Sequence, residues 1–237
     1  MTDPEIIAGT GDVLLLCDHA SNAVPDEIAL GVAPELLDLH IAVDIGAAAL
    51  TRALADRLDA PAILASVSRL VIDLHRETHH PDLIPSTSDG HVIPGNVLPD
   101  RGARIAAFHD PYHDALSGMV DQVRPVLLAA IHSFTPRLAS AAADRPWEVA
   151  LLYNQDDRAA RIAIDLLTAA GLRVGDNQPY SGKLLNATLN RHAEARGLPY
   201  LAIEVRNDLI SDEAGIARWT DILAPVIATT RDRCASG

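Results

Sequence analysis

The chain has 237 residues, of which 49% are hydrophobic and 3% aromatic, so it is long enough to bury a substantial core. Its 19 Lys+Arg against 32 Asp+Glu give a net charge of −13, which disfavours nucleic acid and anionic membrane surfaces as partners. Two cysteines, Cys17 and Cys234, exclude a disulfide framework and a cysteine metal cluster. The sequence shows neither a signal peptide nor a membrane span. We expect one soluble, cytoplasmic domain over residues 1–237.

The first half of the chain begins with a continuous apolar run that is typical of a strand buried on both faces. A long polar stretch rich in Pro, Gly and His then runs to about Pro99, and such stretches inside a domain are usually functional or disordered. The elements expected before it are a strand at Val13–Cys17, a helix at Leu39–Leu58, and strands at Ala62–Ala65 and Ser68–Leu74.

The second half alternates buried apolar runs with helical patterns. The expected elements are a helix at Arg101–Val123 with a kink or boundary at Pro111, strands at Pro125–Ile131 and Glu148–Tyr153, a helix at Asp157–Ala170, a strand at Leu172–Val174, a helix at Leu184–Arg196, a strand at Leu198–Ile203, and a last helix capped by Ser211 that ends near Arg233. This alternation predicts a layered α/β fold with a mostly parallel sheet.

Ionisable side chains follow three of the expected strands. His19, His132 and Glu204 each stand where an apolar run ends. Ligands of such sheets bind at the carboxyl ends of the strands, so these side chains are expected to converge there. Two imidazoles suit zinc, and a carboxylate off the metal can take a proton from water. The alternative is that each histidine caps a turn or bonds a carbonyl group.

Several motifs occur in an order that resembles the N-formylglutamate amidohydrolase family. They are CDHASNAVP at residues 17–25, VDIGA at 43–47, SRLVIDLHR at 68–76, AIHSFTP at 130–136, NQPYSG at 177–182 and IEVRND at 203–208. The family is similar in fold to zinc carboxypeptidases and aspartoacylases. The resemblance therefore implies a three-layer α/β fold, with a central mixed, mostly parallel sheet between helices and a hydrolytic zinc ion at its carboxyl edge.

The resemblance also implies roles for the three strand-end residues. His19 and His132 match zinc ligands, and Glu204 resembles the general base of the related zinc hydrolases. Those relatives carry a second ligand, a glutamate, three residues after the first histidine, where this chain has Asn22. An amide is a poor zinc ligand beside a carboxylate, so Asp44 is the preferred third ligand and Asn22 the alternative. Asp44 could instead cap the helix that follows it.

The segment that ends in Arg76 resembles the substrate-binding block of aspartoacylases. The resemblance implies that Arg69 polarises the acyl oxygen, and that Asp73, His75 and Arg76 bind the substrate, with Arg76 on its α-carboxylate. Arginine suits this role because its guanidinium group can form two parallel bonds to a carboxylate. His75 replaces the asparagine of the aspartoacylases.

Two further residues are candidates for substrate contacts. Tyr180 lies in a segment that resembles a family loop bordering the site, and its hydroxyl could donate to the substrate. Arg206 follows Glu204 by two positions, so the two side chains share a face of a strand. Arg206 could therefore contact substrate or pair with Glu204.

His109 and His113 are spaced four apart beside Pro111, and we interpret both as structural residues.

These observations favour a zinc-dependent amidohydrolase that cleaves the N-acyl bond of a small, acidic amino acid, such as N-formyl-L-glutamate. A second hypothesis is hydrolysis of a peptide or cell-wall amide. A third, motivated by Asn22, is a catalytically silent domain that binds metal or a small molecule. The sequence leaves open the acyl group, the exact amino acid, the pathway and the formation of a homo-oligomer.

Overall fold

The computed structural model describes residues 3–140 and 144–236. Its strands are β1 (Glu5–Ile7), β2 (Val13–Cys17), β3 (Ala62–Leu64), β4 (Thr87–Ser88), β5 (His91–Val92), β6 (Leu127–Phe134), β7 (Val149–Leu152), β8 (Val174–Asp176) and β9 (Tyr200–Arg206). Its α-helices are α1 (Ala47–Leu58), α2 (Arg101–Arg104), α3 (Asp110–Val123), α4 (Arg158–Ala169), α5 (Ala187–His192) and α6 (Glu213–Ala235).

Seven strands form the main sheet in the order β1-β3-β2-β6-β9-β7-β8. The pairs β2–β3, β2–β6, β6–β9 and β7–β8 are parallel, whereas β1–β3 and β7–β9 are antiparallel. This confirms the expected mixed, mostly parallel sheet. The edge strand β1 and the two-stranded β4–β5 ladder were not predicted.

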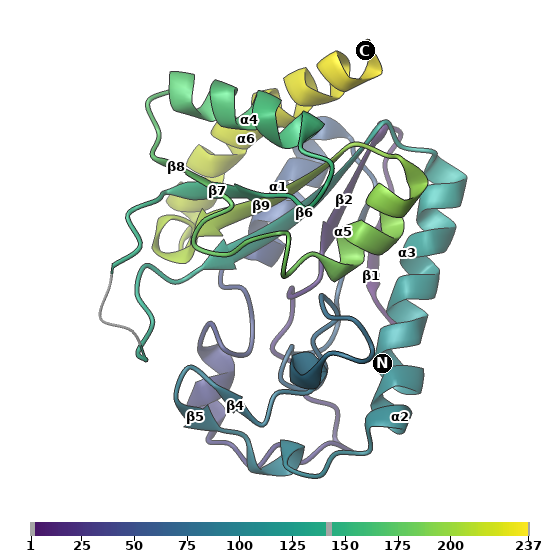
Figure 1. Ribbon diagram of the computed structural model, residues 1–237, viewed down its shortest axis with the longest axis vertical. Coiled ribbons are helices and arrows are strands. Elements are labelled where there is room, and N and C mark those ends of the chain that lie inside the picture. The colour runs from purple at the N-terminus through teal and green to yellow at the C-terminus, as the bar shows by residue number, and fades with distance from the viewer. Residues whose placement is uncertain (1–2, 141–143, 237) are drawn as a thin grey trace.

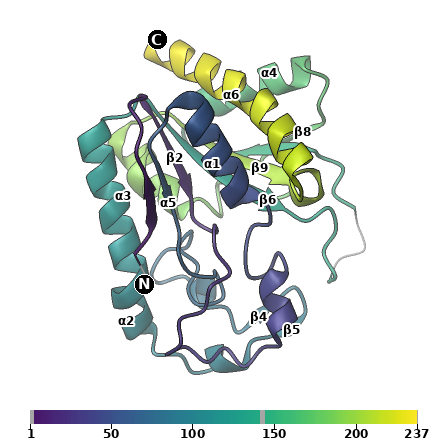
Figure 2. The same ribbon diagram turned by 180° about the vertical axis from the view of Figure 1, so that it is seen from behind.

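The sheet is the middle layer of three. Its central strands β2, β6 and β9 are almost wholly buried because helices cover both faces. Helices α1, α4 and α6 pack together on one face, and α3 and α5 lie on the other (Figures 1 and 2). Within the described ranges, no helix is both long and apolar enough to cross a membrane.

Several helix boundaries differ from the expected ones. The helix predicted from Leu39 begins at Ala47, because Gly46 has a φ of 80° and a Cβ there would meet the backbone oxygen of Ile210. Pro111 marks a boundary, as expected: it lies in the first turn of α3, directly after a π-helical turn at Ile105–His109. The cap of the last helix is Asp212, not Ser211.

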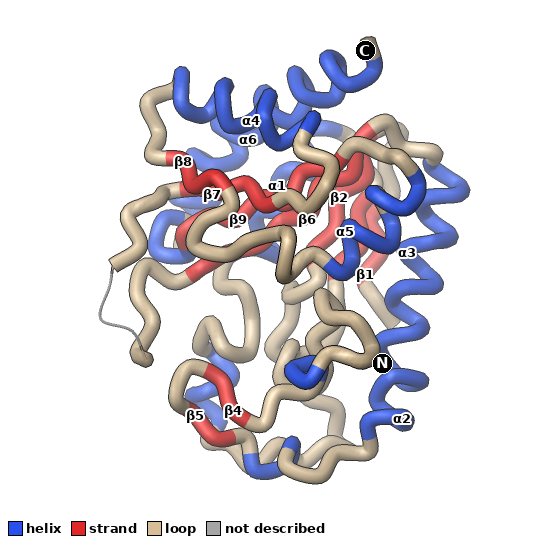
Figure 3. The backbone as a smooth tube through the Cα atoms, in the orientation of Figure 1, coloured by secondary structure: helices blue, strands red, loops and turns tan. Residues whose placement is uncertain are grey.

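The prediction of a strand at Ser68–Leu74 was wrong. The segment is a series of buried turns, in which the Ser68 hydroxyl donates to Ala42 O and the Leu70 N–H donates to the Ser68 hydroxyl. Buried polar side chains replace the missing ladder, since Asn96 donates to Leu70 O and Arg104 to Val71 O. Figure 3 shows that most of the chain beyond the carboxyl edge of the sheet is loop.

Candidate active site

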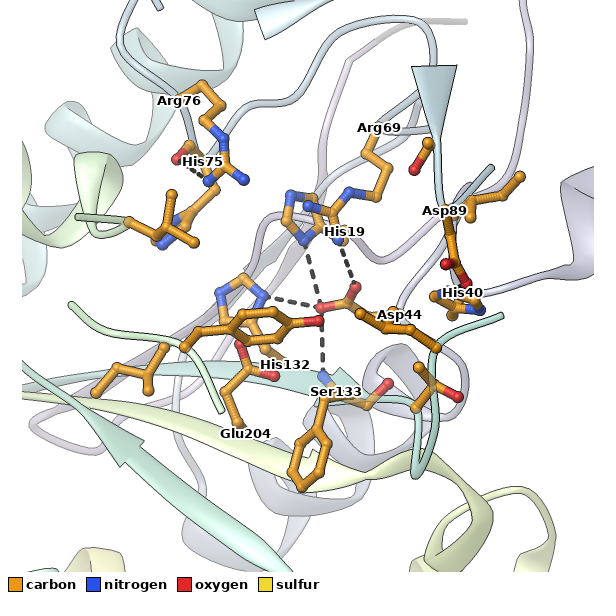
Figure 4. A pocket seen from close by; sticks show the side chains of 18 of the residues that line it. His19, His40, Asp44, Arg69, His75, Arg76, Asp89, His132, Ser133 and Glu204 are labelled. Carbon is orange, nitrogen blue, oxygen red and sulfur yellow. Dashed lines mark hydrogen bonds and ion pairs between the residues drawn. The ribbon is translucent and has the colours of Figure 1, made fainter. Parts of the chain in front are cut away.

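The candidate site is a cavity of about 240 Å³ at the carboxyl edge of the central strands (Figure 4). Strand β6 carries His132 into it, β9 carries Glu204, and His19 follows the end of β2. His132 and Glu204 are register partners on neighbouring parallel strands, so the pairing of β6 with β9 places them side by side. The loop between β3 and α2 forms the opposite wall.

Two of the predicted ligands, His19 and His132, approach the same carboxylate oxygen of the third, Asp44. Oδ2 of Asp44 lies 3.3 Å from Nδ1 of His19 and 2.9 Å from Nδ1 of His132. Potential ligand atoms of these three buried residues all lie within 4.8 Å of one another. Two imidazole nitrogens and a carboxylate oxygen form a donor set that zinc accepts, so the residues fit a metal ion.

Two further carboxylates lie near the Nε2 atoms of the two histidines of this cluster. Asp73 Oδ1 lies 2.8 Å from Nε2 of His19, and Asp18 Oδ2 lies 3.6 Å from Nε2 of His132. Carboxylates in such positions orient a metal-binding imidazole and increase its basicity. Each histidine therefore offers Nδ1 to the cluster while its other nitrogen faces a carboxylate.

The structure distinguishes between the two candidates for the third ligand. Asn22 donates to the exposed carboxylate of Asp38 and does not line the cavity. Asp44 lies between the two histidines and also accepts from the Ser133 N–H. The geometry thus favours Asp44.

A second group of potential ligands is Asp18, His75 and His132. Asp18 lies 2.8 Å from Nδ1 of His75 through one oxygen and accepts from the Tyr112 hydroxyl through the other. It is only 1% exposed and does not line the cavity. All three members of the cluster around Asp44 line the cavity, whereas Asp18 is closed off from it, so the cluster around Asp44 is the better metal site.

Opposite charges within the site stabilise each other's ionised forms. Burial by itself would raise the pKa of Asp44, but His19 and Arg69 lower it well below its ordinary value. Burial would lower the pKa of His132, but Asp18 and Asp44 raise it well above the usual range. The buried carboxylates therefore remain ionised beside the imidazoles.

Among the described residues that line the cavity, Glu204 is the one carboxyl group with a raised pKa. Burial raises it to about 7, with a contribution from the charge of Asp44, against the opposing effect of His132. Its Oε2 has no hydrogen-bond partner among the described residues. A carboxyl group with a pKa near neutrality and a free oxygen is suited to general acid–base chemistry.

Two arginines of the loop face the cavity with different degrees of pairing. Arg69 donates to Asp44 Oδ1 at 3.2 Å and to Asp73 Oδ2 at 2.8 Å. Arg76 makes only long contacts, at 3.4 Å to His75 O and 4.0 Å to Asp73 Oδ2, and its buried Nε has no partner among the described residues. Arg76 therefore has donors left for an anion.

The remaining predicted substrate residues divide into two groups. His75 and Tyr180 line the cavity. Asp73 does not line it and lies behind His19, so its contacts point to support of a ligand rather than to substrate binding. Arg206 also lies outside the cavity wall, because its guanidinium pairs with Asp208 at 2.7 and 3.2 Å instead of turning toward Glu204.

Sequence reasoning missed several residues around the cavity. Asp18, directly before His19, could have been noticed as a second polar residue at the end of the strand. His40 and Asp89 line the cavity from separate loops, and no local signal connects them. Arg145 packs on the ring of Tyr180, with its Cζ 4.8 Å from the centroid, and donates to the tyrosine hydroxyl.

Comparisons with known proteins agree with this geometry. Over residues 11–211 the chain matches the family model of N-formylglutamate amidohydrolase. It is similar to the crystal structure of a gene product of Agrobacterium tumefaciens, with 33% identity, a TM-score of 0.93, and coverage of 98% of this chain and 96% of that one. No curated protein sequence matches it significantly.

Two more distant structures share the fold. N-formylglutamate amidohydrolase from Ralstonia eutropha is 20% identical, with a TM-score of 0.74 and full coverage of both chains. A bacteriophage poly-gamma-glutamate hydrolase is 9% identical, with a TM-score of 0.52 and coverage of 96% of this chain and 88% of that one. The family model spans most of the sequence and includes every predicted ligand. The chain therefore belongs to the N-formylglutamate amidohydrolase family, whose members hydrolyse amide bonds.

Proposed function

We propose that the protein is a zinc-dependent amidohydrolase that releases a small amino acid from its N-acyl derivative, with N-formyl-L-glutamate as the reference substrate. The observation that supports this most directly is the meeting of a His19–Asp44–His132 donor set with Glu204 in one cavity. The cavity volume of about 240 Å³ lies below the range of drug-sized sites and suits a small metabolite.

His19, Asp44 and His132 would hold the metal ion. When bound, zinc would polarise the acyl oxygen of the substrate and make water more acidic. The chain itself supplies the orientation: Asp73 bonds the outer nitrogen of His19, and Arg69 bonds the free oxygen of Asp44. These contacts keep both side chains turned toward the cavity.

Glu204 is the group that moves the proton. Its unpartnered Oε2 can accept a proton from the attacking water, and the carboxylic acid so formed can give it to the departing amine nitrogen. A pKa of about 7 suits both directions, because neither protonation state is strongly favoured at neutral pH.

Arg76 would bind the α-carboxylate of the substrate through its free donors. His75 and Tyr180 border the same cavity and would position the substrate, while Arg69 would assist at the acyl oxygen. A positive site is required because an anionic substrate is repelled at long range by a protein with a net charge of −13.

Hydrolysis of N-formyl-L-glutamate tests the proposal. We expect activity that is lost on chelation and restored by zinc. Glu204→Gln should keep its zinc and lose at least about 10²-fold in kcat, the contribution of a positioned acid or base. Turnover of Glu204→Gln within a few-fold of the wild type would remove Glu204 from this role, and full activity after chelation would contradict the metal dependence.

A further inference from the structure

The cavity extends beyond the metal cluster on the side away from Arg76. Figure 4 shows Arg76 on one side of His19, Asp44 and His132, and the pair of His40 and Asp89 on the other. This second end is also lined by hydroxyl residues and by apolar side chains. The hydroxyl residues are Ser133, Thr135 and Ser140, with Ser88 next to Asp89 in the chain. We call this end, together with His40 and Asp89, the far wall.

The hydroxyl hydrogens of Ser133, Thr135 and Ser140 are already used within the protein. Ser133 donates to Ile45 O at 2.8 Å, and Thr135 donates to Arg137 O at 2.8 Å. The acceptors in both bonds are carbonyl oxygens, which cannot donate, so each hydroxyl hydrogen has a fixed direction. Ser140 likewise donates to a carboxylate oxygen of Asp89 at 2.6 Å. What these residues can present to the cavity is therefore their lone pairs.

Asp89 adds a negative charge to this end. Its oxygens accept from the backbone N–H groups of Ala139 and Ser140, which with the Ser140 hydroxyl lower the pKa of the carboxyl to about 2 against the effect of burial. His40 Nε2 lies 3.0 Å from Asp89 Oδ2, and burial lowers the pKa of His40, so the histidine does not neutralise this charge at neutral pH.

No arginine in the described part of the chain pairs with Asp89. Among the described residues that line the cavity, the arginines are Arg69 and Arg76, and both pair with or approach Asp73 instead. Arg145 lies nearby but outside the cavity wall, stacked on the ring of Tyr180, with Nη1 donating to Thr135 O and the tyrosine hydroxyl. The far wall consequently favours groups that donate hydrogen bonds and disfavours a carboxylate.

The position of the scissile bond decides which part of the substrate reaches the far wall. If the amide lies at the metal cluster and the α-carboxylate at Arg76, the amino-acid part occupies the Arg76 side. The acyl part then points toward His40 and Asp89. A formyl group ends at the reacting carbon and has no atom to extend to the far wall.

We propose, resting on the function proposed above, that the far wall is an acyl-binding site for acyl groups that are longer than formyl and end in a hydrogen-bond donor. The ammonium of an aminoacyl group and the hydroxyl of a hydroxyacyl group share this chemistry. The reaction remains hydrolysis: water adds its OH to the acyl carbon, the C–N bond breaks, and the amine leaves with the second hydrogen. The end of the acyl group is unchanged.

A matched acyl series on one amino acid tests the proposal. The amino acid is the one whose N-formyl derivative is hydrolysed fastest, and the acyl groups are glycyl, glycolyl, propionyl and malonyl. The first three have nearly the same size and end in an ammonium, a hydroxyl and a methyl group. We expect kcat/KM for the glycyl substrate to exceed that for the propionyl substrate by about tenfold, the effect of one charge-assisted hydrogen bond. The value for the glycolyl substrate should lie between them, and the malonyl substrate should be hydrolysed most slowly.

Variants locate the preference in the far wall. Asp89→Asn should bring the glycyl-to-propionyl ratio to within about threefold of unity, since it removes the charge. Thr135→Val keeps the shape of the side chain and should lower the glycolyl-to-propionyl ratio of kcat/KM. This variant tests the proposal independently if the loss of the Asp89 carboxylate disrupts its loop. Asp165→Asn, an exposed residue of α4, changes the net charge equally and should leave both ratios as in the wild type. Ratios within one variant are independent of its folded fraction.

The outcomes separate this proposal from the one on which it rests. Hydrolysis of the N-formyl derivative with equal rates for glycyl, glycolyl and propionyl, or with malonyl fastest, overturns the acyl-binding site and leaves the proposed function standing. No hydrolysis of any member by the zinc-loaded protein overturns both. Ratios that stay unchanged in both Asp89→Asn and Thr135→Val also overturn the acyl-binding site.

Discussion

The central strands and the inner segment 67–75 of the loop between β3 and α2 are both largely buried, but different interactions hold them. In β2, β6 and β9 the backbone groups pair within the ladder and the side chains are almost all apolar. In the loop, Asn96 donates to Leu70 O and Pro85 O, and Arg104 donates to Val71 O. The site takes His132 and Glu204 from the ladder and Arg69 and Arg76 from the loop, so its geometry depends on both kinds of support.

Removing a core side chain from the sheet should have the largest effect on stability. Leu15 in β2 is fully buried, and Leu15→Ala should lower the free energy of unfolding by about 3–5 kcal/mol through lost burial and a cavity. Urea denaturation measures this loss. A change below about 1 kcal/mol would contradict the tight packing of the sheet.

Removing a polar side chain that supports the loop should cost less and act locally. Asn96→Ala leaves the buried carbonyl of Leu70 and the partly buried carbonyl of Pro85 without their donor, which should cost about 2–3 kcal/mol. Hydrogen exchange should rise in residues 66–99 before it rises in β2 and β6. The matched control is Asn22→Ala, at an exposed position, which should change stability by about 0.5 kcal/mol or less. Equal costs for the two variants would argue against the polar support of the loop.

Acid should weaken the loop through two buried histidines. His113 Nε2 lies 3.0 Å from Leu74 O and must donate to it, so Nδ1 of His113 accepts from Nε2 of His192 at 2.9 Å. Protonation of either ring would place two N–H groups against each other or charge a buried ring. Burial lowers the pKa of His113 to about 3 and that of His192 to about 4.

The sign of the pH effect follows from proton binding. The unfolded histidines bind protons below about pH 6.5 and the folded ones do not, so stability falls as the pH drops from 7 to 5. Each histidine should contribute about 2 kcal/mol to this loss. His192→Gln should therefore lose about 2 kcal/mol less than the wild type over the same interval, measured by urea denaturation. Identical losses in both proteins would contradict the account.

The smallest expected effect concerns the contact between the loop and the metal cluster. Asp73→Asn should weaken zinc binding by about tenfold, because the asparagine lacks the negative charge that orients His19. Competition with a chelator measures the dissociation constant. Asp82→Asn, at an exposed position of the same loop, is the control. If the two variants bind zinc equally well, Asp73 does not support the ligand.

The same comparison explains what could be predicted from the sequence. The runs that form β2, β6 and β9 are continuous and apolar, so their strands were predicted and His19, His132 and Glu204 could be assigned to one edge of the sheet. The structure brings all three together there. Asp44 could be named as a ligand only through the family resemblance, because nothing in its local sequence distinguishes a ligand from a helix cap.

The loop could not be predicted in the same way. Ser68–Leu74 has the apolar content of a strand, and the partners that turn it into a buried loop, Asn96 and Arg104, are more than twenty residues away in sequence. Arg206 was expected to share the site with Glu204, since alternation puts both on one face. Its pairing with Asp208 depends on the turn after β9, which the strand pattern does not describe.

The most direct test of the central claim, that His19, Asp44 and His132 hold a metal ion, is the metal content of three purified proteins. We predict about one zinc per chain in the wild type and in Asn22→Ala, and much less in His132→Ala at equal folded fraction. Equal zinc in the wild type and His132→Ala, or loss of zinc in Asn22→Ala alone, would contradict the assignment of the ligands.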